Sequence, residues 1–196
     1  MEDTTTGVGA QQELRSQIES LLVNDGLQCS QCVIAVLGEQ LGPGARALEG
    51  AALPLGRGMA GTGGLCGALT GGLLALGAAF ESDRPVPPGT QPAPLSFLTE
   101  WIPNNDWLDA QSAVGVEPPV FSLCRDLMAE FSGAYETEDG SVSCAELSGV
   151  DWSAPTREQL ARYYAPGGEL SRCVEMIGSV ASRVHELMER TPAGTT

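Results

Sequence analysis

Residues 170–188 read LSRCVEMIGSVASRVHELM, and this stretch decides the fold class. Its apolar side chains recur at every third or fourth position over about five turns, which is the period of an amphipathic α-helix. They are Leu170, Cys173, Val174, Ile177, Val180, Ala181, Val184, Leu187 and Met188. A helix with such a stripe buries it against other helices. Because alternating strand patterns are nearly absent elsewhere, we predict an all-α fold, a compact helical bundle.

Shorter helical segments precede this one. The predicted segments are residues 14–22, ended by Asn24-Asp25-Gly26, then 29–37, 45–53, 65–80 and 121–131. Segment 65–80 is the most apolar and contains four glycines, so we expect it to be the buried central helix, with Thr62 as its N-cap. It is shorter than the roughly 20 residues that span a bilayer, so no membrane insertion is expected.

The composition indicates a single domain. The chain has 196 residues, 42% hydrophobic and 18% charged, which suits one well-buried core. We place the domain at residues 11–190, between flexible tails at 1–10 and 191–196. Within it, residues 82–120 are rich in proline and tryptophan and are predicted to form a surface insertion.

The charge balance restricts the partners. With 25 acidic and 10 basic residues the net charge is −15, which repels nucleic acid and anionic membrane surfaces. A basic redox protein is the partner that such a surface would attract. Residues 1–6 carry no basic, apolar secretory signal, so we expect a cytoplasmic protein. Its oligomeric state, including a homodimer, is left open.

Six cysteines in a reducing compartment favour metal binding or redox chemistry over structural disulfides. Cys66 and Cys173 are expected near helix N-termini. Ser143 and Glu146 form a capping box, which places Cys144 at the first helical residue. Unpaired N–H groups at a helix N-terminus favour the thiolate, the form that binds metals and attacks disulfides.

Several familiar cysteine sites are not matched. Cys29-Ser30-Gln31-Cys32 lacks the βαβ pattern of thioredoxins, and Val33 stands where covalent haem attachment requires histidine. The other cysteines are too far apart for a zinc finger or a ferredoxin run. The only histidine, His185, is expected on the surface. A site assembled by folding, with one cysteine from each of several helices, remains.

The order of the motifs resembles the C-GCAxxG-C-C family of redox-active proteins. The resemblance is carried by GLQCSQ at 26–31, GLCGALTG at 64–71, SCAEL at 143–147 and the late Cys173. It covers roughly residues 12–80 and 121–190, although the family's GCAxxG string is not matched letter for letter. It implies that the functional cysteines are Cys29, Cys66, Cys144 and Cys173, and that Cys32 and Cys124 are additions.

The family is also similar to part of the split-Soret cytochromes, which implies an iron–sulfur cluster at these cysteines. Our leading hypothesis is therefore a redox or electron-transfer protein with a cluster held by Cys29, Cys66, Cys144 and Cys173, and without covalent haem. Cys32 is kept as a further ligand to consider. One alternative is a thiol–disulfide oxidoreductase without a cofactor that uses Cys29 and Cys32, or Cys66. The other is a structural zinc site. Whether the protein is an enzyme is left open.

Overall fold

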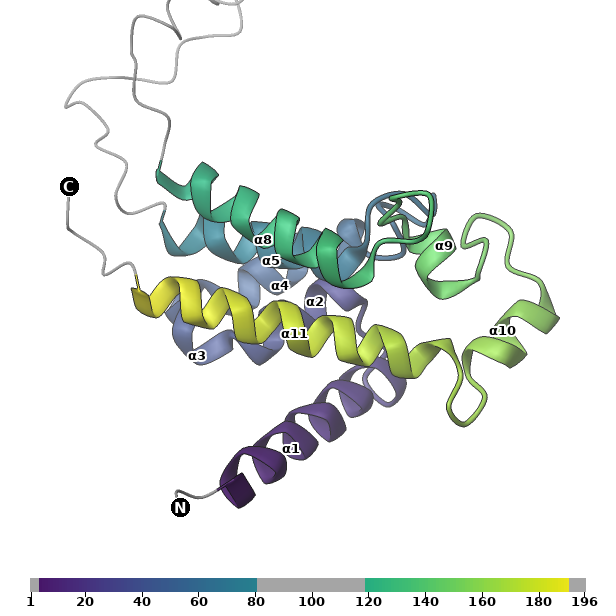
Figure 1. The fold of residues 1–196 in the computed structure, drawn as a ribbon, viewed down its shortest axis with the longest axis horizontal. Helices are drawn as coiled ribbons and strands as arrows, with labels where there is room; N and C mark the ends of the chain where they lie inside the picture. The colour runs from purple at the N-terminus through teal and green to yellow at the C-terminus, as the bar shows by residue number, and fades with distance from the viewer. Residues whose placement is uncertain (1–3, 81–118, 191–196) are drawn as a thin grey trace, which may run out of the picture.

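In the computed structural model, which describes residues 4–80 and 119–190, the chain is built from α-helices joined by short turns (Figure 1). Their bounds are α1 Thr4–Val23, α2 Cys29–Val36, α3 Gly38–Leu41, α4 Ala45–Ala52, α5 Gly67–Ala79, α8 Pro119–Tyr135, α9 Cys144–Ser148, α10 Arg157–Tyr163 and α11 Glu169–Arg190; 3-10 turns occupy Gly42–Gly44 and Leu53–Leu55. No β-strand occurs in these residues, so the all-α prediction is confirmed.

Helix α11 runs the length of the bundle (Figure 1). It packs on α5, α2 and α8 and also contacts α1 and α9. The predicted stripe is buried from Cys173 through Leu187, with Met176 added to it. Helices α9 and α10 lie at the end of the molecule where α11 begins (Figure 1).

Helix α5 is the central helix, as predicted, because it packs against α2, α4, α8 and α11. Its glycines permit this crowding. A Cβ on Gly71 would lie 2.7 Å from the carbonyl oxygen of Ser30, so the α2 backbone approaches α5 at a distance that only glycine permits. Beside it, a Cβ on Gly72 would lie 2.5 Å from Val180 of α11.

Two sequence predictions fail in detail. Thr62 does not cap α5, because Cys66 is the N-cap and the Thr62 hydroxyl donates instead to the carbonyls of Gly58 and Met59. On α8 the spacing of the sequence predicts one apolar stripe, made of Phe121, Cys124, Leu127, Met128 and Phe131. Only part of it is buried: Leu127 and Phe131 are buried, whereas Phe121 and Met128 are 53% and 41% exposed. The buried face continues through Val120 and Leu123 because these lie seven and four residues before Leu127.

The predicted tails and insertion are only partly within the described residues. Helix α1 begins at Thr4, so most of the predicted tail at 1–10 is helical. The insertion at 82–120, apart from its last two residues, and the tail at 191–196 lie outside the described residues. None of the helices in the described ranges combines the length and apolarity of a membrane span.

Candidate functional site

Four cysteines line one small buried cavity. Cys29, Cys66, Cys144 and Cys173 surround a space of about 10 Å³ whose other walls are the apolar Ala68, Leu147 and Met176. These are the four cysteines that the family resemblance selected. Cys32 and Cys124 do not line the cavity.

Each of the four cysteines lies at or near the beginning of a helix. Cys29 is the first residue of α2, Cys66 is the N-cap of α5, Cys144 is the first residue of α9, and Cys173 lies in the second turn of α11. The predicted positions of Cys66 and Cys144 near helix starts are therefore confirmed. The predicted helical segment 29–37 also begins at Cys29, as α2 does.

A short backbone pairing joins Cys66 to Cys144. Leu65 and Ser143 form an isolated antiparallel bridge, in which the Cys66 N–H donates to Val142 (3.1 Å) and the Cys144 N–H donates to Gly64 (2.5 Å). A Cβ on Gly63 would lie 2.9 Å from the Cβ of Ala145. The glycines before Cys66 therefore allow the start of α9 to lie against them.

The turn before this bridge has an unusual backbone. Five consecutive residues, 57–61, have positive φ, among them Arg57 (52°), Met59 (62°) and Ala60 (56°). Left-handed conformation costs a residue with a Cβ roughly 1–2 kcal/mol. A cost of this kind persists where the surrounding structure enforces it, and it is common at functional sites.

The Cys29-x-x-Cys32 motif is divided between two environments. Ser30 donates to the carbonyl of Ala52 (2.8 Å), and Gln31 donates to that of Glu49 (3.3 Å), so both central residues tie α2 to α4. Cys32 is fully buried in the core. Burial, followed by the charges of Glu49 and Asp25, raises the pKa of Cys32 to about 12.

Cys29 and Cys173 interact, and the interaction shifts their pKa values in opposite directions. A hydrogen bond from Cys29 lowers the pKa of Cys173, burial opposes this, and the Tyr163 hydroxyl adds to the lowering. The pKa of Cys29 is raised well above its usual value by the same hydrogen bond and by burial. Cys173 is thus the member of the four that is most easily ionised.

The other two cysteines are protonated at neutral pH. Burial raises the pKa of Cys66 to about 11, against the backbone N–H groups of Leu69 and Ala68 that lower it. Burial raises the pKa of Cys144 to about 12, and the charges of Cys66 and Cys173 add to this. A bound metal would supply the positive charge that holds these thiols deprotonated.

A larger cleft adjoins the cysteines. It has a volume of about 240 Å³ and is lined by Cys29, Cys144 and Cys173, together with an aromatic wall and Arg57. The wall is Trp152, whose ring lies 5.2 Å from that of Tyr163, and Tyr164 beyond it at 4.9 Å from Tyr163. These residues were not predicted as part of a site; the signal for them in the sequence is the adjacent pair Tyr163-Tyr164 at the end of a helix that begins with a capping box.

Trp152 also supports α9. Its indole N–H donates to the Ser148 hydroxyl (3.0 Å), which donates to the carbonyl of Cys144 (2.6 Å). This chain of hydrogen bonds fixes the short helix that carries Cys144.

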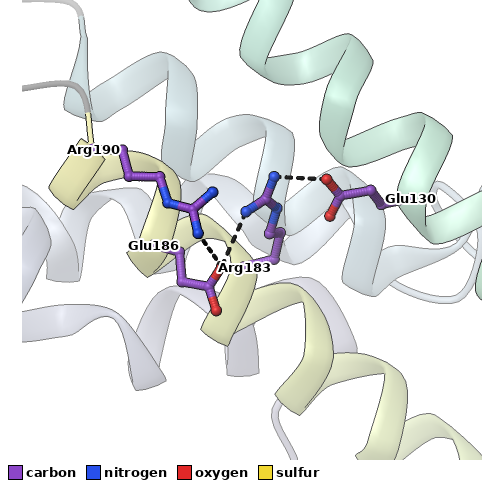
Figure 2. Close-up of polar contacts among 4 residues, drawn as sticks. All are labelled: Glu130, Arg183, Glu186 and Arg190. Carbon is purple, nitrogen blue, oxygen red and sulfur yellow. Dashed lines mark hydrogen bonds and ion pairs between the residues drawn. The ribbon is translucent and has the colours of Figure 1, made fainter.

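A larger hollow lies elsewhere. A groove of about 780 Å³ runs between α1 and α11 and contains none of the cysteines. Ion pairs edge it, with Arg183 joined to Glu130 of α8 at 2.6 Å and to Glu186 at 3.0 Å, and Arg190 beyond them (Figure 2). His185 pairs with Glu189 at 3.4 Å on the partly exposed side of the same helix. We regard the small cysteine cavity as the chemical site because it gathers reactive groups and the groove does not.

The donor set of the cysteine cavity fits a soft metal centre, because four thiol groups meet there without a competing oxygen ligand in its lining. In residues 4–80 and 119–190, however, no three His, Cys, Asp or Glu side chains are already arranged to hold a metal ion. Metal binding therefore requires the sulfur atoms to turn toward one another.

Comparison with known proteins adds one finding. The family described as "Putative redox-active protein (C_GCAxxG_C_C)" matches residues 27–187. This range includes all four cavity cysteines. No curated protein and no solved structure matches the chain.

Proposed function

We infer that this chain, which belongs to the C_GCAxxG_C_C family of redox-active proteins, carries electrons through an iron–sulfur cluster held by Cys29, Cys66, Cys144 and Cys173. The observation that carries this proposal is the shared cavity of these four cysteines. Four thiolates are the usual ligands of such clusters. A bound cluster would supply reversible one-electron chemistry.

The space around the cysteines suits this proposal if the site opens on one side. A cavity of about 10 Å³ is near the minimum that holds a single water molecule. Three of the four cysteines also line the adjoining cleft of about 240 Å³. Turning those side chains toward the cleft gives the inorganic atoms room that the inner cavity alone does not have.

Hydrogen-bond donors near the sulfur atoms would tune the site. The N–H groups of Leu69 and Ala68 lie at Cys66, and the Tyr163 hydroxyl lies at Cys173. Hydrogen bonds to the sulfur atoms are one means by which a protein sets the reduction potential of a cluster. Burial of Cys66 and Cys173 shields the site from water.

The partner in this proposal is a basic redox protein in the cytoplasm. The net charge of −15 favours association with a positively charged surface and opposes association with nucleic acid.

A second candidate is thiol–disulfide exchange, favoured by the pairing of Cys29 with Cys173. In this reaction the Cys173 thiolate attacks a substrate disulfide and releases one substrate thiolate. Cys29, once deprotonated, then attacks the mixed disulfide and releases the second. The protein is oxidised to a Cys29–Cys173 disulfide and the substrate is reduced by two electrons. The pair differs from the Cys29 and Cys32 pair expected from sequence.

Anaerobic purification with assays of iron, zinc and acid-labile sulfide tests the proposal. We expect iron and sulfide with visible charge-transfer absorption, all lost in Cys66→Ser and kept in Cys124→Ser, whose sulfur is outside the cavity. Colourless protein containing zinc would establish the structural zinc site instead. Metal-free protein that forms a titratable Cys29–Cys173 disulfide would establish the second candidate.

A further inference from the structure

The cleft beside the cysteines has the size of a small-molecule site. Its volume is about 240 Å³, and its floor includes Cys29, Cys144 and Cys173. A cavity of about 150 Å³ is enough to hold benzene. The cleft therefore has room for one aromatic ring with a polar substituent.

The walls of the cleft suit a flat, apolar molecule. Trp152 and Tyr163 meet edge to face with their ring centres 5.2 Å apart, and Tyr164 continues the wall. Leucines, including Leu27 and Leu170, line other parts. Aromatic walls recognise a flat ring through offset or edge-to-face contacts.

One cation stands over this wall. The guanidinium of Arg57 lies 5.0 Å from the centre of the Trp152 ring, and Arg57 is the one Arg, Lys, Asp or Glu side chain among the described residues that line the cleft. No carboxylate of the described residues forms an ion pair with it. A guanidinium stacked on a ring keeps its edge N–H groups free to bind a carboxylate in a bidentate manner.

The backbone holds Arg57 at the cleft in spite of a conformational cost. Its φ is 52°, and close contacts enclose both neighbouring glycines, since a Cβ on Gly56 would lie 2.4 Å from Gln28 and one on Gly58 would lie 2.4 Å from Gly64. In a chain with only 10 basic residues, one of them is thus fixed at the edge of an aromatic cleft that leads to the cysteines.

We propose that this cleft binds a small planar organic anion, an aromatic ring bearing a carboxylate, with the ring against Trp152 and Tyr163 and the carboxylate on Arg57. The claim that this ligand contacts the redox centre rests on the proposed function. Its binding depends on the cleft alone. Arg57 selects the charge and the aromatic wall selects the shape.

The test is calorimetric titration of the purified protein with benzoate and with benzamide, its neutral analogue of nearly the same shape. Arg57→Asn removes the cation without adding backbone strain, because asparagine tolerates positive φ. Arg57→Lys keeps the charge. Arg46→Asn, on the exposed side of α4 away from the cleft, is the control with the same change of charge.

We expect benzoate to bind more tightly than benzamide. Arg57→Asn should weaken benzoate about tenfold, the loss of one charge-assisted contact, and leave benzamide unchanged. Arg57→Lys should lose less, and Arg46→Asn should match the native protein. Equal binding of the two ligands, no binding of either, or equal effects of Arg57→Asn and Arg46→Asn would overturn the proposal.

The same samples separate this proposal from the proposed function. Iron and sulfide content reports on the cysteine site, and titration reports on the cleft. Metal-free protein that still binds benzoate through Arg57 rejects the cluster and keeps the cleft. Iron loss in Arg57→Asn with unchanged benzoate binding would instead show that Arg57 balances the charge of the cysteine site, which would overturn the ligand proposal.

Discussion

The two ends of helix α11 are built on different principles. Near its beginning, Cys173 meets the buried Cys66 and Cys144 and the partly buried Cys29, beside a turn with five consecutive positive φ values. Toward its other end, Arg183 pairs with Glu130 and Glu186 on a partly exposed surface (Figure 2).

The difference separates function from stability. Surface ion pairs such as those of Arg183 add little to stability, and their loss is tolerated. The buried thiols of Cys66 and Cys144 have raised pKa values. They lie beside a left-handed turn whose backbone has a conformational cost, and helix packing does not require such a turn. In the proposed function the beginning of α11 carries the chemistry, whereas the buried stripe of its later part packs the bundle together.

The largest expected effect is loss of the cofactor from cysteine variants. Replacing Cys29, Cys66, Cys144 or Cys173 singly by serine should abolish iron retention, because a hydroxyl is a poor ligand for a soft metal site. Iron assay of each purified variant checks this.

Cys124→Ser is the control for these variants, since Cys124 lies on α8 outside the cavity. Full iron content in all four cavity variants would reject the ligand set. Loss confined to Cys29→Ser and Cys32→Ser would shift the assignment to the Cys-x-x-Cys pair.

The next largest effect is expected at two glycines of α5, whose replacement by alanine should change the stability in opposite directions. Gly71→Ala should lower the free energy of unfolding by about 1–3 kcal/mol, because the new Cβ would lie 2.7 Å from the Ser30 carbonyl oxygen of α2. Gly77→Ala meets no atom within 4 Å and should raise it by about 0.5–1 kcal/mol through helix propensity. Urea denaturation measures both. The same sign for both variants would contradict the close approach of α2 to α5.

The raised pKa of the buried Cys32 thiol predicts that the stability of the protein depends on pH. The pKa of Cys32, raised by burial from the ordinary 9.0 to about 12, means that the folded protein keeps a proton that the unfolded chain loses. This contribution to stability is complete below about pH 9 and is lost as the pH rises toward about 12. Between about pH 8 and about pH 10.5, the free energy of unfolding of the native protein should fall by roughly 2 kcal/mol more than that of Cys32→Ala. Urea denaturation at the two pH values measures this; parallel losses in both proteins would place Cys32 in contact with water.

The smallest effect is expected at the charged part of α11. Arg183→Gln removes the ion pairs with Glu130 and Glu186 and should cost about 0–1 kcal/mol, less at high salt. Iron content should not change. A loss of iron in this variant would show that the two ends of α11 are not independent.

The helices could be predicted because their periodicity is a local property. The stripe of α11 and the cap at Ser143 depend on residues within a few positions of one another, and both are confirmed. The stripe on α8 was predicted only in part, because Phe121 and Met128 satisfy a helical period on a face that none of the described helices covers.

The site was harder to predict from the sequence than the helices were. The four cysteines were selected through the family resemblance, and their meeting depends on the bridge between Leu65 and Ser143, for which no local pattern exists. The roles of Arg57, Trp152 and Tyr163 arise from contacts between residues far apart in the chain. Such contacts follow from packing, which composition and spacing do not determine.

X-ray absorption at the iron edge of anaerobically purified protein tests whether the four cysteines hold an iron–sulfur cluster, since it reports the atoms bound to the metal. We expect iron with sulfur neighbours only, a second iron nearby, and loss of the iron signal in Cys66→Ser but not in Cys124→Ser. Iron bound by nitrogen or oxygen, or protein in which the absorbing metal is zinc alone, would contradict it.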